Sequence, residues 1–361
     1  MTDWDQVWDE RFVSRWREMM SASATAHVFF EPQMVRWWVQ QFRREYNGQP
    51  RFGLARHAGG TEALYPLMQF GGSWKCGWRR WLGPVGFEGF DYLDPIFAGP
   101  VDPSALRSYW RQLLGEIVSR FGRSCGPIRL LRVQEAQADE QAGFRHHCSA
   151  LQIPLGDATC AWDALPSGGH LKRDIRRRIR RLEETAPVSL RVFGPDEADA
   201  AKAEIPALRR ALGARWATAA GSGGYFENLI DACLGEGYLH FSCLNWGDRA
   251  ISWHMGFLHG GRFYYYKPAF EQGLAPFSPG KVHIAMLLNW LLPGKASVFD
   301  FLRGDEAYKL DWTRDGQSVQ SLEIAAQTRW LRLRQWATAP IPRALSAYRD
   351  IRKRVRRATV C

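Results

Sequence analysis

A Ser278-Pro279-Gly280-Lys281 turn stands directly before an apolar run with helical spacing, and its residue types suit the binding of phosphate. Proline is favoured in the first turn of a helix, where an amide N–H would have no partner within the helix. Gly280 would let a ligand approach the backbone closely. N–H groups at a helix start, with Lys281 beside them, suit phosphate oxygens. Ser278, Gly280 and Lys281 are therefore predicted to bind the phosphates of a cofactor, and the alternative is an ordinary helix start.

A dense polar cluster, DFLRGDEAYK at residues 300–309, follows an apolar strand. Asp300 alternates with two phenylalanines, and a carboxylate in a half-buried strand needs a partner, which Arg303 or Lys309 could supply. Asp300 is either a catalytic group that orients or deprotonates an acceptor amine, or half of a buried ion pair that holds the loop 303–309. Lys309 would steer a phosphate or carboxylate, or simply lie at the surface.

A histidine and a run of aromatic residues precede these two segments. His254, in ISWHMGF, is a side chain that accepts a proton near neutral pH, although a lone strand histidine can equally be packing or surface. In the run FYYY, Tyr264 and Tyr266 would point to one face of a strand, where they could line an acceptor channel. His146-His147 has no supporting carboxylates, so no metal site is predicted.

Three blocks, the SPG turn, FDFLRGDEAYKLDW and GRFYYYKPAF, resemble the CelD/BcsL-type acetyltransferases. These are a branch of the GNAT (Gcn5-related acyltransferase) superfamily related to the Fem-type aminoacyltransferases. The likeness extends more loosely over most of the chain. It implies acetyl-CoA or another acyl-CoA as co-substrate, and it implies that Tyr308 protonates the leaving thiolate. The SPGK turn departs from the usual Q/R-x-x-G-x-G/A pattern, so aminoacyl-tRNA stays open as the donor.

The resemblance implies an N-acyltransferase in which an amine of an envelope or exopolysaccharide precursor attacks the thioester directly. The alternatives are a Fem-like transferase that uses aminoacyl-tRNA and a non-catalytic accessory protein of polysaccharide synthesis. The predicted catalytic residues are Tyr308, Asp300 and His254. The predicted substrate-binding residues are Tyr264, Tyr266, Arg303 and Lys309.

The elements that must position these residues follow an alternating order of strands and helices. Strands are predicted at 188–193, 238–246, 249–258, 262–270, 298–303 and 317–326, and helices near 196–213, 223–235, 280–292 and 305–311. This order predicts an α/β fold of tandem GNAT-like domains, with mixed central sheets flanked by helices and the C-terminal domain better preserved. We expect a degenerate N-terminal domain at 1–160, an acyltransferase domain at 161–335 and a basic tail at 336–361. Acyl-CoA would lie where the strands 262–270 and 298–303 splay apart.

The net charge of +11 in 361 residues is concentrated in two predicted helices, 170–181 and 343–357. Each contains seven Lys or Arg residues and one Asp, so the rest of the chain is close to neutral. These helices are either solvated amphipathic helices, or docking surfaces for an anionic membrane or for tRNA.

The seven cysteines show no C-x-x-C pair, which favours reduced thiols. No apolar run approaches the roughly 20 residues of a membrane span, and the N-terminus has no signal-peptide core. The expected location is the cytoplasm, or the periphery of the inner membrane face.

Overall fold

The structure of the protein, a computed structural model, describes residues 1–56, 61–71, 80–99, 102–121, 126–156, 169–215, 224–292 and 294–324. The chain forms two compact units: unit 1 comprises Met1–His147 with Gln320–Cys361, and unit 2 comprises Cys148–Val319. The predicted domain limit at 160 and the predicted basic helix 343–357 lie outside the described residues.

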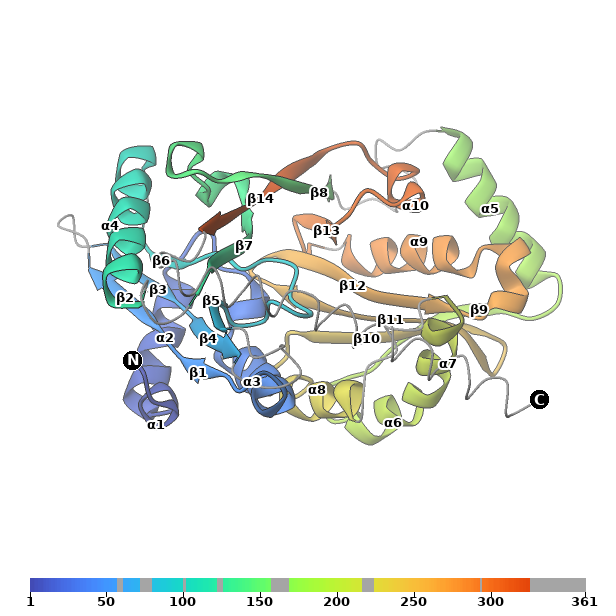
Figure 1. The fold of residues 1–361 in the computed structure, drawn as a ribbon. Coiled ribbons are helices and arrows are strands. Elements are labelled where there is room, and N and C mark those ends of the chain that lie inside the picture. The colour runs from blue at the N-terminus through green and yellow to red at the C-terminus, as the bar shows by residue number, and fades with distance from the viewer. Residues whose placement is uncertain are drawn as a thin grey trace, which may run out of the picture. The chain divides into compact units, whose positions relative to one another are not determined.

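Unit 1 contains two groups of strands and several helices (Figure 1). The helices are α1 (Trp4–Val7), α2 (Glu10–Ser21), α3 (Pro32–Tyr46) and α4 (Pro103–Phe121), with the 3-10 turns η1 (Val28–Phe30), η3 (Glu135–Gln137) and η4 (Glu140–Ala142). The strands are β1 (Gln49–Pro50), β2 (Gly53–Arg56), β3 (Glu62–Tyr65), β4 (Leu67–Gly71), β5 (Arg80–Pro84), β6 (Ile96–Ala98) and β7 (Ile128–Gln134). Within unit 1 the strand orders are β1-β4-β5-β7-β14 and β2-β3-β6, and β5 and β7 are parallel.

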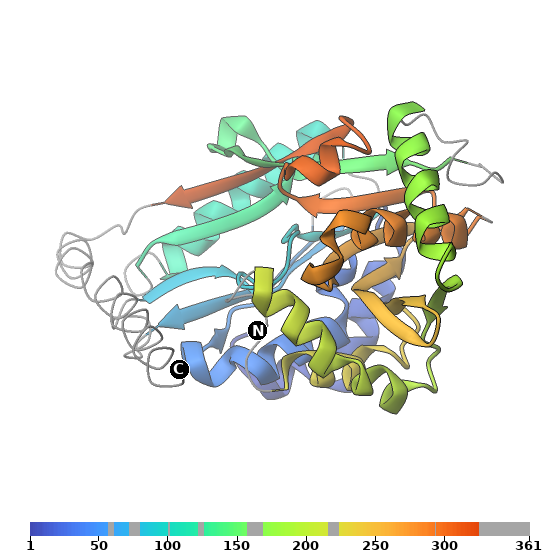
Figure 2. The same ribbon diagram turned by 90° about the vertical axis from the view of Figure 1, so that its right-hand side faces the viewer.

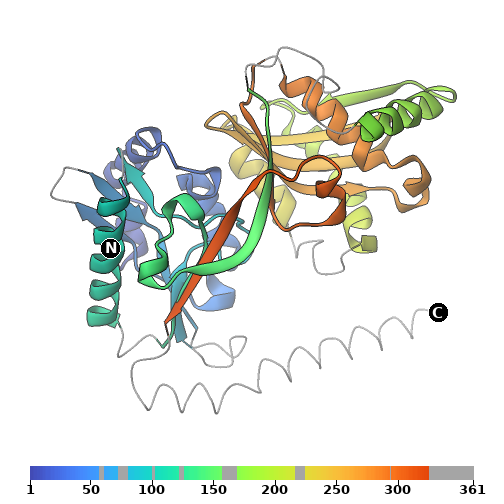
Figure 3. The ribbon, with the colours of Figure 1, turned by 90° about the horizontal axis from the view of Figure 1, so that it is seen from above.

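Two strands, β8 (Arg145–Pro154) and β14 (Gly316–Ile324), each contain a boundary between the units and run side by side (Figures 2 and 3).

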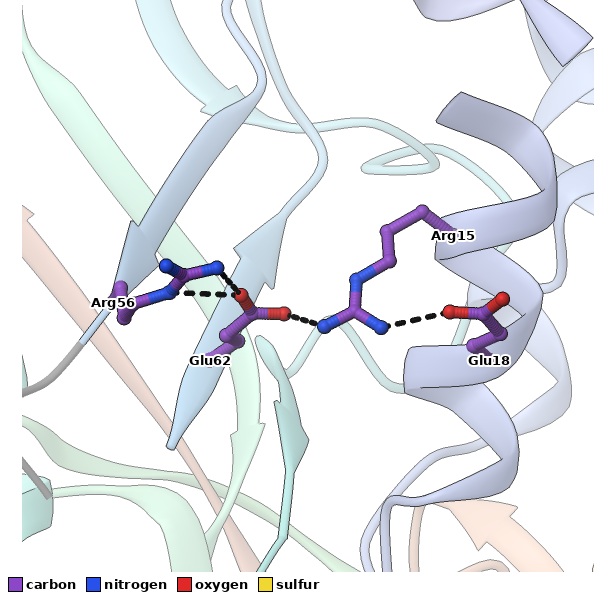
Figure 4. A network of polar contacts seen from close by, with 4 residues as sticks. All are labelled: Arg15, Glu18, Arg56 and Glu62. Carbon is purple, nitrogen blue, oxygen red and sulfur yellow. Dashed lines mark hydrogen bonds and ion pairs between the residues drawn. The ribbon is translucent and has the colours of Figure 1, made fainter. Parts of the chain in front are cut away.

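A four-residue network of ion pairs ties the helix α2 to the strands β2 and β3 in unit 1 (Figure 4). The carboxylate of Glu62 accepts from Arg56 at 2.6 Å and from Arg15, and Arg15 also pairs with Glu18 at 2.7 Å. These hydrogen bonds, that from Arg56 first, lower the pKa of Glu62. The network links α2 to β3, the middle strand of the three-stranded sheet, and through Glu62 to the edge strand β2.

Unit 2 is built around the strand order β8-β13-β12-β11-β10-β9. Its further strands are β9 (Val188–Val192), β10 (Leu239–Trp246), β11 (Arg249–His259), β12 (Arg262–Phe270) and β13 (Val298–Arg303). Its helices are α5 (Gly169–Glu183), α6 (Ala198–Ala203), α7 (Ile205–Arg215), α8 (Tyr225–Cys233), α9 (Pro279–Leu291) and α10 (Ala307–Leu310), with the 3-10 segment η6 (Gln272–Phe277). All strand pairs in this part are antiparallel except β12 with β13.

Helices cover both faces of the sheet in unit 2, because alternate residues of its strands are apolar on each side. Phe263 and Tyr265 of β12 lie in a core cluster with residues of α9 and α5. On the other face, Tyr266 bonds Tyr225 of α8, and the indole of Trp253 donates to Glu204. The sheet is therefore buried between two helical layers.

The elements predicted in the second half are confirmed, most closely β12 and β13, whose bounds agree with the prediction. The predicted helix 196–213 is divided into α6 and α7. The prediction of a mixed α/β fold flanked by helices is confirmed. Among the described cysteines, Cys148, Cys233 and Cys243 are free thiols. Within the described ranges, no helix is long and apolar enough to span a membrane.

Candidate active site

The candidate site is the point in unit 2 at which β12 and β13 part. Their parallel pairing covers only Arg262 to Tyr264 on β12, and the last pair is Tyr264 with Asp300. Beyond it, β12 continues to Phe270 along β11, whereas β13 continues along β8. The splayed pair of strands that the sequence predicted is therefore present.

A β-bulge in β12 lies directly after the last pair. Tyr264 opposes Phe257 and Lys267 opposes Met255, so that Tyr265 and Tyr266 share the space opposite Gly256. A β-carbon on Gly256 would collide with the carbonyl oxygen of Tyr264 and with the ring of His254. The bulge therefore requires glycine at 256, as a close backbone approach in a strand often does.

A second irregularity, in β13, is held by the buried carboxylate of Asp300. Its Oδ1 accepts from the Leu302 amide at 2.7 Å, and Leu302 has φ +60°, an unusual conformation for a bulky residue. Its Oδ2 accepts from Gln152 at 3.1 Å and pairs with Arg262 at 3.0 Å. The contacts of Asp300 thus support its interpretation as half of a buried ion pair. The predicted partners, Arg303 and Lys309, are wrong, because the carboxylate pairs with Arg262 and accepts from Gln152.

Lys309 stabilises the same loop from its other end. The side chain is 3% exposed, and its ammonium donates to the carbonyl oxygens of Arg303 at 2.8 Å and Gly304 at 3.3 Å. It also pairs with Glu306 at 2.7 Å. The alternative of a surface lysine is therefore wrong, because this ammonium is enclosed by the loop's own oxygens, and the role of Lys309 in binding substrate stays a prediction. Arg303 itself is exposed.

The start of α9 has the features of an anion site. Ser278 has φ +49° and precedes Pro279, and no side chain caps the helix. The nearest atom to a β-carbon placed on Gly280 would be in Phe270, at an ordinary 3.5 Å. Lys281 pairs with Asp311 at 2.8 Å, just beyond α10. This ion pair brings the SPG turn and the helix that contains Tyr308 to the same end of the splayed strands.

Tyr308 is half-buried, and its ring lies edge-on to that of Phe301 at 6.3 Å between centroids. Tyr264 and Tyr266 are 2% and 8% exposed, so both lie within the protein. The hydroxyl of Tyr266 lies 2.9 Å from that of Tyr225 on α8. The structure therefore brings Tyr308 and the α9 start together and places the two predicted channel tyrosines in the opposite layer.

His254 is fully buried and stacks on Tyr265, with ring centroids 4.4 Å apart. Among the described residues, neither of its ring nitrogens has a hydrogen-bond partner. Burial holds its pKa well below the ordinary value, with neighbouring His240 and His283 adding to the effect. The ring therefore stays neutral inside the core, and the structure gives no support to its predicted role as a base.

Sequence reasoning missed His283 and His240, the neighbours of His254. His283 lies 3.1 Å from the hydroxyl of Ser242 and 3.0 Å from that of Ser252. The sequence signal for a buried His283 was its position among the regularly spaced apolar residues of the predicted helix 280–292. No group of three or more His, Cys, Asp or Glu residues that could hold a metal occurs in the described part of the chain.

Comparisons with known proteins agree with this geometry. Residues 169–310 match the family model of the Acetyltransferase (GNAT) domain. A comparison with curated protein sequences gave no match.

Three solved structures cover most of this chain. FemX has a TM-score of 0.58 at 10% identity, covering 89% of this chain and 98% of that one. A conserved protein of unknown function from Bacteroides thetaiotaomicron VPI-5482 has a TM-score of 0.54 at 12% identity, covering 86% and 96%. The C-terminal domain of a candidate lysylphosphatidylglycerol synthetase from Agrobacterium fabrum has a TM-score of 0.54 at 9% identity, covering 91% and 96%.

At these identities the three structures show the fold alone. The family model falls in unit 2, the half of the chain predicted to be better preserved, whereas the description of unit 1 as a degenerate copy stays a prediction. Residues 169–310 of this chain are thus similar to the acetyltransferase domain of the GNAT type.

Proposed function

We propose that the protein is an acyl-CoA-dependent N-acyltransferase whose reaction takes place where β12 and β13 part. The observation that carries this proposal is the end of parallel pairing at Tyr264 and Asp300, with a bulge in each strand beyond it. Diverging parallel strands expose backbone N–H and C=O groups that an extended acyl-pantetheine chain can bond. The uncapped start of α9 would bind the pyrophosphate.

The chemistry is direct transfer. The acceptor amine attacks the thioester carbon, a C–N bond forms and the C–S bond breaks. Tyr308 donates its phenolic proton to the leaving thiolate and is reprotonated from solvent. The ammonium proton passes to water, because the carboxylate of Asp300 already accepts from Leu302, Gln152 and Arg262.

The finer assignments rest on the resemblance to the CelD/BcsL type. It favours acetyl-CoA as donor and an amine of an envelope or exopolysaccharide precursor as acceptor. Reaction with such a precursor would take place in the cytoplasm or at the inner face of the membrane.

A thermal-shift titration with acetyl-CoA tests the donor. A ligand at 100 times its Kd stabilises the folded state by about 2.7 kcal/mol, which is a clear rise in Tm. Gly280→Asp, which puts a negative charge beside the phosphates, should abolish the shift. Gly280→Ala is the matched control, because its methyl group meets only an ordinary contact with Phe270. A shift that persists in Gly280→Asp would contradict the assignment of the α9 start.

A second candidate, transfer from aminoacyl-tRNA, is favoured by the helix α5. Arg173, Arg177 and Arg180 are exposed on it. From the same helix, Arg178 donates to the carbonyl of Pro276 at 2.7 Å, just before the α9 start. A basic face therefore adjoins the proposed phosphate site.

Deacylated tRNA in the same titration separates the two donors. Stabilisation by tRNA that falls steeply with salt, together with no shift from acetyl-CoA, would replace the first proposal by the second. If neither ligand shifts the Tm while anionic liposomes bind the protein, the accessory role would be favoured.

A further inference from the structure

Unit 1 contains a cavity of about 440 Å³ between α4 and the strand β2, which lie side by side (Figures 1 and 3). This volume is within the range of small-molecule sites, roughly 300–1,000 Å³. Its apolar lining includes Phe52 from the segment before β2 and Leu113 and Ile117 from α4. None of these residues takes part in the site proposed in unit 2.

The charged residues of the lining are mostly cationic. Within the described part of unit 1 they are Arg51, Arg56, Arg120 and the N-terminal ammonium of Met1, against the carboxylate of Glu116. Arg120 pairs with Glu116 one helical turn away, Arg56 pairs with Glu62 at 2.6 Å, and Arg51 donates to the side-chain oxygen of Gln69 at 2.8 Å. Among the groups that line the cavity, cations therefore outnumber carboxylates beside an apolar wall.

The rim of the cavity adds an exposed apolar side chain. Leu54 lines the cavity and is 54% exposed, the most exposed of the large hydrophobic residues described. Exposed leucines are ordinary when they are single, but this one continues the apolar wall to the surface. Leu54 therefore forms an uncharged part of the rim, over which an apolar ligand could enter the cavity.

We propose that this cavity binds a small anionic amphiphile. Its chain or ring would pack on Phe52, Leu113 and Ile117, and its carboxylate or phosphate would lie near Arg51 and Arg120. Arginine suits both headgroups, because its planar fork of donors matches their oxygens. This second ligand site is independent of the acyltransferase proposal, since it lies in the other unit and involves no covalent step.

Calorimetric titration of the full chain with decanoate, decyl phosphate and decanol tests the proposal. We expect saturable binding of at least one of the two anions with a stoichiometry of one, and binding of decanol that is at least tenfold weaker. Tighter binding of decanoate would identify a carboxylate as the headgroup, and tighter binding of decyl phosphate would identify a phosphate. Equal affinity for decanol and both anions, or no saturable binding of any of them, would overturn the proposal.

Two variants locate the site. Leu113→Trp should abolish binding by filling the cavity, with folding checked by circular dichroism. Leu54→Asp changes an exposed residue, so it keeps the fold, and a like charge near the headgroup should weaken binding by about fivefold.

A third variant, Arg120→Gln, removes a cation of the lining and should also weaken binding. The two charge variants have matched controls on α4 away from the cavity: Ser108→Asp for Leu54→Asp, and Arg111→Gln for Arg120→Gln. Unchanged affinity in Leu54→Asp and Arg120→Gln would mean that the anion binds elsewhere. The shift in Tm that acetyl-CoA produces should be the same in all these variants, so failure here is distinguishable from failure of the proposed function.

Discussion

Gly256 is the residue on which the geometry of the splayed strands depends most directly. Any β-carbon at this position meets the carbonyl of Tyr264, which belongs to the backbone and cannot rotate away. Gly256→Ala should therefore destabilise the protein by about 1–3 kcal/mol, the usual cost of overpacking. Urea unfolding measures this. Gly273→Ala is the control, since a β-carbon there meets open space. Equal stability of the two variants would show that the bulge relaxes freely.

Asp300 is the second residue whose contribution to stability can be tested directly. Removing its carboxylate in Asp300→Ala takes a buried acceptor from Arg262, Gln152 and the Leu302 amide together. Breaking a buried pair in this way costs about 3–5 kcal/mol. The free energy of unfolding should fall by that amount, whereas Arg303→Ala, at an exposed position of the same strand, should change it by less than about 0.5 kcal/mol. A stable Asp300→Ala variant without activity would instead restore the catalytic interpretation.

Tyr308 is the residue assigned to proton transfer. Tyr308→Phe keeps the ring that packs on Phe301 and removes only the hydroxyl. We expect kcat to fall by about 100-fold with little change in KM for the acyl donor, because general-acid catalysis contributes in the transition state. Steady-state kinetics check this, with Leu310→Ala on the same helix as control. An unchanged kcat would remove Tyr308 from the mechanism.

At the scale of the elements, the sequence predicted most of what positions the site. The apolar period of α9, with Pro279 in its first turn, and the alternating strands β12 and β13 are strong local signals. The bulge partners could not be predicted, because the register that leaves Gly256 opposite two residues depends on long-range pairing. The same holds for Asp300, whose partner Arg262 lies 38 positions away rather than in the adjacent loop.

The helix α5 should support the donor site through the loop that precedes α9. Arg178 pairs with Asp174 and bonds Pro276, whereas Arg177 pairs with the same Asp174 but is exposed to solvent. Arg178→Gln should raise KM for the acyl donor about three- to tenfold at unchanged kcat, the effect of one hydrogen bond. Arg177→Gln is the matched control and should leave both constants unchanged. An equal rise in KM in the two variants would mean that the positive charge of α5, and not the bond of Arg178 to the loop before α9, supports donor binding.

At the scale of the whole molecule, buried titratable groups should set the dependence of stability on pH. Burial lowers the pKa of His240 and of His283 to about 3, and that of His254 also falls. The unfolded chain therefore binds protons at these histidines below about pH 6.5 that the folded chain does not bind. Stability is fully present above that pH and is lost as pH falls toward 3. Burial raises the pKa of Asp94 in unit 1 to about 7, which acts in the opposite direction over the same window.

His254→Phe isolates one member of this group. At pH 5 each histidine with a folded pKa near 3 lowers the free energy of unfolding by about 2 kcal/mol relative to neutral pH. His240 and His283 together therefore outweigh the opposite effect of Asp94, and His254 adds to the loss of stability. The phenyl ring should keep the stacking on Tyr265 and remove two buried nitrogens that have no partner among the described residues. Urea midpoints should therefore rise in the variant, and by more at pH 5 than at pH 8. His170→Gln, at an exposed position of α5, should change neither midpoint. An equal rise in the urea midpoint at both pH values would mean that His254 has the same charge in the folded and unfolded chains. The buried histidines would then not explain the loss of stability in acid.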